Sequence, residues 1–158
     1  KTVRSKRLPA DGSCHISGYN LFMSAYHGLA CIGDERIPEP KPLPSFPVIQ
    51  LDNPSATRIN AAHLQITFRI IGDQIPDTQM IVAKIQLTPP GFKSHRGRFR
   101  NYIGTSTDDN HVSFIIHDYR SVSGLDQKEY LVHLRHLLID SDSGHRSKET
   151  PLSTGIGI

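Results

Sequence analysis

Alternation of hydrophobic and polar residues is clearest over residues 63–88. Apolar side chains occupy every second position from 63 to 70 and again from 81 to 87. Side chains of a strand point alternately to its two faces, so each run predicts a strand with one buried face. Residues 72–78 contain glycine, proline and two aspartates, which favour a turn. We therefore expect a β-hairpin at the centre of the sheet. Its polar face would consist of Gln65, Thr67, Arg69, Lys84 and Gln86.

Two further segments have hydrophobic residues at the three- and four-residue spacing of a helix. Residues 18–32 follow Ser17, which can cap a helix, and precede Gly33, which can end one. Residues 125–139 contain Asp126 and, three positions later, Glu129, as in a capping box. Both segments are predicted to be helices, and the first is predicted to cover the hairpin sheet.

Length and element types together predict one α+β domain. A chain of 158 residues buries roughly 70% of its unfolded surface and needs no metal or disulfide to fold. We expect a compact antiparallel sheet around residues 63–88, a further short strand within 111–119, and two helices packed on the sheet, all within residues 1–140. The polar residues 141–158, rich in glycine and serine, are predicted to be a C-terminal tail.

Residues 38–47 contain five prolines, which lock φ and lack a backbone donor, so this segment is predicted to be extended. Two interpretations stay open: a rigid connector between helix and hairpin, or a docking segment that loses little entropy on binding. The candidate self-association residues are Pro38, Pro40, Pro42, Leu43, Pro44 and Phe46 of this segment, with Tyr130 and Leu134 of the second predicted helix.

Two clusters of basic residues are the main functional signal. Four cations lie within residues 1–7, and four more lie among aromatic residues, without an acid, in residues 92–102. Guanidinium groups pair with phosphates, and aromatic rings stack on bases or lie at a membrane interface. The net charge is only +3, so local clusters must attract any anionic partner, although a solvated surface is the alternative. The candidate binding residues are Lys1, Arg4, Lys6, Arg7, Lys93, Arg96, Arg98 and Arg100.

Cysteines and histidines indicate no cofactor. Cys14 and Cys31 could pair, but two cysteines are more typical of free thiols in a reducing compartment. His133 and His136 are three residues apart on the second predicted helix, yet no carboxylate or cysteine has matching ligand spacing, so we expect no metal. No apolar run approaches the ~20 residues that span a bilayer.

In their order along the chain, these segments resemble the matrix proteins of rhabdoviruses. TVRSKR (2–7) is similar to the end of the first core strand, and SGYNLFMSAYHGLACIG (17–33) to the helix that follows it. AHLQITFRIIGD (62–73) resembles a later strand with its acidic turn, and DDNHVSFIIHDY (108–119) the final strand. The resemblance spans residues 2–120 and rests on this order, without a short diagnostic motif.

The resemblance implies a structural protein of the virion, without an active site or cofactor, that self-associates and condenses the nucleocapsid. It implies a location in the host cytoplasm and at the inner face of the host membrane, where the protein contacts anionic lipid during assembly and budding. The viral glycoprotein tail and host budding factors are further partners that it implies. The proline segment 38–47 lacks the Pro-Pro-x-Tyr budding motif of this family, so that role is not assigned to it.

Two other functions are alternatives. Residues 11–14, Asp-Gly-Ser-Cys, resemble the nucleophile motif of ovarian-tumour-type cysteine proteases, with Cys14 opening a helix whose dipole favours the thiolate. His117 would then be the base, oriented by Asp118 or Asn110. His15 and Asp118 stand where that family has apolar and aromatic residues. The second alternative is an RNA-binding module that uses the basic residues of 92–102.

Overall fold

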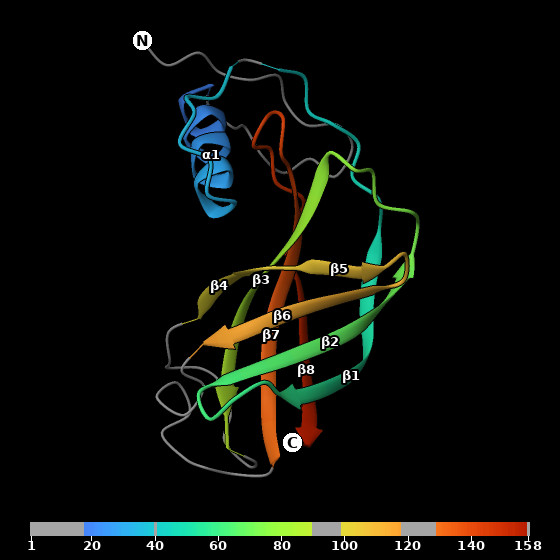
Figure 1. Ribbon diagram of the computed structural model, residues 1–158. Coiled ribbons are helices and arrows are strands. Elements are labelled where there is room, and N and C mark those ends of the chain that lie inside the picture. Colours follow the sequence, from blue (N-terminus) through green and yellow to red (C-terminus); the bar gives the residue numbers. More distant parts are fainter. Residues whose placement is uncertain (1–17, 40, 90–98, 118–128, 158) are drawn as a thin grey trace.

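The computed structural model describes residues 18–39, 41–89, 99–117 and 129–157. In these ranges the chain forms one helix and eight strands (Figure 1). The helix is α1 (Gly18–Cys31). The strands are β1 (Ile49–Arg58), β2 (His63–Gly72), β3 (Gln79–Thr88), β4 (Arg100–Ile103), β5 (Thr105–Asp108), β6 (His111–His117), β7 (Glu129–Asp140) and β8 (Thr150–Gly157).

The strands form two antiparallel sheets that pack face to face. One sheet has the order β1-β2-β6-β5 and the other β4-β3-β7-β8. The strands of the two sheets cross steeply, with the first sheet in front in Figure 1, and β1 lies beside β8 along one side. The described residues are thus mostly β-sheet, and the predicted α+β domain of a sheet packed by helices is wrong.

The predicted hairpin is wrong in its pairing, although both of its strands exist. β2 pairs with β1 and β6, whereas β3 pairs with β4 and β7, so residues 72–78 lead from one sheet to the other. An apolar strand face is buried equally well in either arrangement, so alternation alone does not identify the neighbouring strand. Gln65, Thr67 and Arg69 consequently lie on the outer face of one sheet, and Lys84 and Gln86 on the outer face of the other.

The second predicted helix is the long strand β7. Alternate residues Tyr130, Val132 and Leu134 face the core between the sheets, while Leu137 and Ile139, on the opposite face of the strand, are buried as well. A strand that is buried on both faces is nearly continuously apolar, and such a run also satisfies the spacing of a helix. The same region overturns a second expectation, because residues 150–157 of the predicted tail form β8 and pair with β7.

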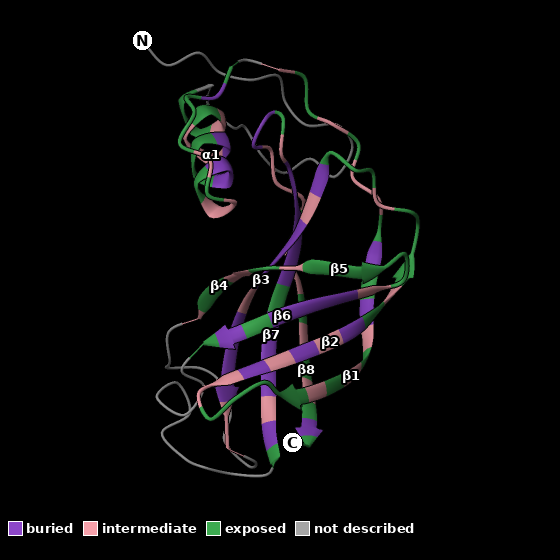
Figure 2. Cartoon of the chain, in the orientation of Figure 1, coloured by how far each residue is buried: buried purple, intermediate pink, exposed green. Residues whose placement is uncertain are grey.

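Hydrophobic side chains from both sheets fill the space between them, as the buried stretches of β2, β3, β6 and β7 in Figure 2 show. Phe68 of β2 and Phe114 of β6 are fully buried at its centre, with their ring centroids 6.2 Å apart in an edge-to-face arrangement. Aromatic pairs prefer this geometry because the positive ring edge meets the negative ring face.

Gly104 marks the point where the chain passes from β4 in one sheet to β5 in the other. Its amide nitrogen donates to the carbonyl oxygen of Ile81 at 2.8 Å. A β-carbon here would lie 2.5 Å from Cγ2 of Val112 and 3.1 Å from Cε1 of Phe114. A glycine is therefore needed for the close approach at this corner.

Helix α1 forms as predicted, but it lies outside the two-sheet core. It packs against the turn between β7 and β8 (Figure 1), where Leu29 is buried and Arg146 donates to the hydroxyl of Ser24 at 3.2 Å. At its C-terminal end, Cys31 and Ile32 pack on the outer face of the second sheet. The expectation that this helix covers a hairpin sheet is therefore wrong.

Candidate functional site

An exposed aromatic face on α1 is the strongest candidate for an interaction site. Tyr19, Phe22 and Tyr26 are 63%, 42% and 42% exposed, respectively. Their spacing of three and four residues places them on one side of the helix. We call these three residues the α1 aromatic face. The neighbouring side of the helix, with Ala25 and Leu29, is buried, so α1 is held in place while its aromatic residues face outward.

The connector, residues 34–48, runs back along α1 and then crosses to β1 (Figure 1). Arg36 anchors its start: Nε donates to Oδ2 of Asp34 at 2.8 Å, and Nη2 donates to the carbonyl oxygen of Ser141 at 2.8 Å. Further along, Nε2 of His145 lies 3.1 Å from the carbonyl oxygen of Lys41. The proline segment thus lies against its own domain, as expected of a rigid connector.

The predicted self-association residues divide into exposed and buried groups. Pro42 and Leu43 are exposed, Pro44 and Phe46 are half-buried, and Pro38 is buried. Pro40 lies outside the described residues.

Two of the predicted self-association residues are buried in the core. Tyr130 and Leu134 are each 1% exposed, in the core between the sheets. They were assigned to a helix with a free apolar face, and that assignment fails because β7 is a core strand.

Most of the predicted basic residues lie outside the described ranges. This holds for Lys1, Arg4, Lys6, Arg7, Lys93, Arg96 and Arg98. Arg100 is exposed on β4, where it is the register partner of Ile85. Beside it in sequence, the ring of Phe99 lies 5.1 Å from the guanidinium carbon of Arg135, a cation–π contact.

One residue proposed for the cysteine-protease alternative, Asn110, lies too far from His117 to act with it. Cys14 and Asp118 lie outside the described residues. Asn110 immediately precedes β6 and His117 ends it, so seven steps along an extended chain place them roughly 23 Å apart. Asn110 therefore cannot orient the His117 ring, which instead contacts the ring of His63 with centroids 4.7 Å apart.

His133 and His136 do not form a metal site. Three residues apart on a strand, they point to opposite faces of β7, whereas on a helix they would share a face. His133 is bonded to Thr88 and Ser153 on the outer face, and His136 is buried near Phe46 and Ile49. Within the described ranges there is also no group of three or more potential metal-ligating side chains.

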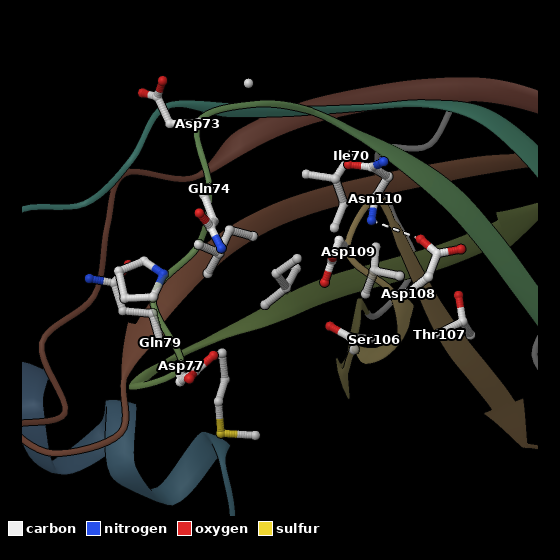
Figure 3. Close-up of a pocket in the computed structure, with 17 residues that line it drawn as sticks. Ile70, Asp73, Gln74, Asp77, Gln79, Ser106, Thr107, Asp108, Asp109 and Asn110 are labelled. Atoms are coloured by element: carbon white, nitrogen blue, oxygen red, sulfur yellow. Dashed lines mark hydrogen bonds between the residues drawn. The ribbon is translucent and has the colours of Figure 1, made fainter.

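An acidic cavity that the sequence did not indicate lies between the β2–β3 connection and the β5–β6 turn. Its volume is about 710 Å³. Figure 3 shows Asp73 and Asp77 on one side and Asp108 and Asp109 on the other. The sequence contains the two acidic segments that line it, 73–77 and 108–109, but their separation along the chain does not indicate that they lie together.

Hydrogen bonds from within the chain stabilise the charged form of one carboxylate of this cavity. A hydrogen bond from His111, assisted by the backbone amide of Asn110, lowers the pKa of Asp108 below its usual value. The described lining residues include no lysine or arginine, so the cavity favours cations over anions.

In the described part of the chain, no helix has the length and apolar character needed to cross a membrane. Comparisons of the chain with protein-family models, curated proteins and solved structures find no match.

Proposed function

We propose that this chain is a structural protein of the matrix type, which self-associates, condenses a nucleocapsid and links it to an anionic membrane. The observation that carries the self-association is the α1 aromatic face: Tyr19, Phe22 and Tyr26 are exposed on a helix that lies outside the core. The other roles rest on the basic clusters in the sequence and on its resemblance to rhabdovirus matrix proteins. The fold that this resemblance implied is not the one observed, so the fold itself gives the proposal no support.

Aromatic residues fixed on a rigid element suit a protein–protein contact. Tyrosine is enriched among the residues that dominate binding energy, because its ring buries a large area and loses few rotamers. The contact of α1 with the β7–β8 turn holds the ring-bearing helix in place, so less ordering entropy is lost on association. Ile37 and Leu43 in the connector are also exposed apolar residues, and a standard interface buries ~800 Å² per partner.

Self-association is tested by sedimentation of the chain over a range of concentrations. We expect reversible oligomers in the natural chain and a shift to monomer in the double variant Phe22→Gln/Tyr26→Gln, since glutamine keeps helix propensity but removes the apolar contact. Ile115→Gln is the matched control, because Ile115 is 41% exposed on the outer face of the first sheet. A natural chain that stays monomeric at all concentrations, or a double variant that assembles like the control, would contradict the proposal.

Membrane and nucleocapsid contacts are tested by flotation with anionic liposomes and by RNA binding at increasing salt. Each cation near an anionic membrane contributes about 1 kcal/mol, and phosphate contacts weaken steeply as salt rises. We expect joint replacement of Arg96, Arg98 and Arg100 by glutamine to reduce both kinds of binding without changing the melting temperature. Unchanged binding would show that these arginines do not form the contact.

A further inference from the structure

Two histidines face each other on the outer face of the first sheet. His63 is the first residue of β2 and His117 the last of β6, and the antiparallel register places them directly opposite. Their ring centroids are 4.7 Å apart with an interplanar angle of 83°. His117 is exposed and His63 half-buried, so both rings are accessible from this face.

Asn60 determines which nitrogen of His63 is available. Its side-chain oxygen lies 2.8 Å from the amide nitrogen of Ala62 and 2.9 Å from that of His63. Both amides are donors, so the Asn60 atom that they contact must be the oxygen. The same oxygen lies 2.8 Å from Nδ1 of His63, and an acceptor there requires the proton on Nδ1. The lone pair of neutral His63 is therefore on Nε2.

We propose that His63 and His117 bind a divalent transition-metal ion of the Zn²⁺ type through their imidazole nitrogens, with water completing the coordination. A hydrogen bond from the other ring nitrogen to an oxygen acceptor, as Asn60 provides, is the usual support of a metal-bound histidine. Zn–N bonds are about 2.0–2.1 Å long, so two imidazoles at a tetrahedral angle have centroids roughly 5 Å apart. The observed 4.7 Å agrees with this separation.

A modest rotation is needed to reach the bound geometry. The rings now meet edge to face, so their lone pairs do not point at one position. They converge on one ion when the His117 ring turns about its side-chain torsions. His117 is exposed at the end of its strand, so this rotation meets little steric resistance. His63, already held by Asn60, keeps its orientation.

Other described histidines have different surroundings. His111, on the same face at the other end of β6, is paired with the carboxylate of Asp108 at 2.9 Å. Both ring nitrogens of His133 are bonded to hydroxyls, and Nε2 of His145 contacts a carbonyl oxygen. His111 therefore serves as a matched control in a chain with nine histidines.

The test is a titration of the chain with ZnCl₂ at about pH 7.5, where an unperturbed imidazole is neutral. Imidazole ¹⁵N resonances, recorded by NMR, identify the ligands, and calorimetry measures the affinity. We expect the Nε2 signal of His63 and a ring-nitrogen signal of His117 to shift together and saturate. His63→Ala and His117→Ala should each weaken this binding by about tenfold or more, and His111→Ala should leave it unchanged.

Asn60 variants separate a positioning role from a purely structural one. Asn60→Asp keeps the oxygen acceptor and adds charge, so Zn²⁺ should bind at least as tightly as to the natural chain. Asn60→Ala removes the acceptor and should weaken binding about tenfold, with the melting temperature recorded for both variants. The proposal would be overturned if the double variant His63→Ala/His117→Ala bound Zn²⁺ as tightly as the natural chain. It would also be overturned if the ring-nitrogen signals of His63 and His117 in the natural chain did not shift with Zn²⁺. Neither outcome bears on self-association through α1.

Discussion

A β-carbon on Gly28 of α1 would overlap the carbonyl oxygen of Gly144 in the β7–β8 turn. The reverse also holds, since a β-carbon on Gly144 would overlap the carbonyl oxygen of Ala25. The helix and the turn thus approach backbone to backbone at two glycines. Gly144 also has a φ of 78°, which favours glycine. This contact sets the position of α1, and with it the α1 aromatic face.

Gly28→Ala should displace α1 from the turn. Alanine favours a helix over glycine by about 1 kcal/mol, but the overlap is with backbone atoms that cannot rotate away. We expect faster amide hydrogen exchange in residues 18–31 and little change in the core strands. Gly157→Ala is the control, because a β-carbon there would meet no atom of the described residues within 4 Å. Equal protection of α1 in both variants would show that the glycine contact does not position the helix.

Gly104→Ala should destabilise the core itself. Its β-carbon would press on Val112 and Phe114, and overpacking of this kind costs about 1–3 kcal/mol. Urea denaturation should show a lower midpoint than for the natural chain and for Gly157→Ala. An unchanged midpoint would mean that the corner between β4 and β5 relaxes without loss.

His136 should make stability depend on pH. Desolvation by burial lowers the pKa of His136 below the 6.5 of a free imidazole. Between the folded-state pKa and about 6.5, the unfolded chain binds more protons than the folded chain. Burial of neutral His136 therefore leaves the folded state at full stability above about pH 6.5, and the free energy of unfolding decreases as the pH falls through this window.

Urea denaturation of the natural chain, His136→Gln and His117→Gln at several pH values tests this dependence. We expect the decline on acidification to be smaller in His136→Gln, because glutamine does not titrate. His117→Gln is the comparison variant, because it removes an exposed histidine from the other sheet. An identical slope in all three proteins would assign the acid sensitivity to other groups.

Gln86→Met should stabilise the fold. The side-chain oxygen of Gln86 is buried and has no hydrogen-bond partner among the described residues, and such a group costs about 1–3 kcal/mol. Methionine has a similar length without an unpaired acceptor, so we expect the free energy of unfolding to rise by about 1 kcal/mol. Gln65→Met, on the half-exposed outer face of the first sheet, should change it little. A loss of stability in Gln86→Met alone would refute the expectation.

The candidate sites were only partly predictable. Helical spacing predicts α1, but it also led to the expectation that this helix covers the sheet, and the exposure of its aromatic residues depends on where the helix lies. The His63–His117 pair could not be predicted, because 53 intervening positions give no sign that β2 and β6 are neighbours in register. The acidic cavity likewise combines two turns from different parts of the chain.

Local pattern determined the identity of several elements. Alternating apolar residues identified β2, β3 and the core of β6, and three- and four-residue spacing identified α1, because side-chain periodicity follows directly from backbone geometry. Tertiary structure decided which strands pair, that β2 and β3 lie in opposite sheets, and that 129–140 is a strand. Strand hydrogen bonds join residues that are distant in sequence, and a segment that is buried on both faces carries no distinctive period.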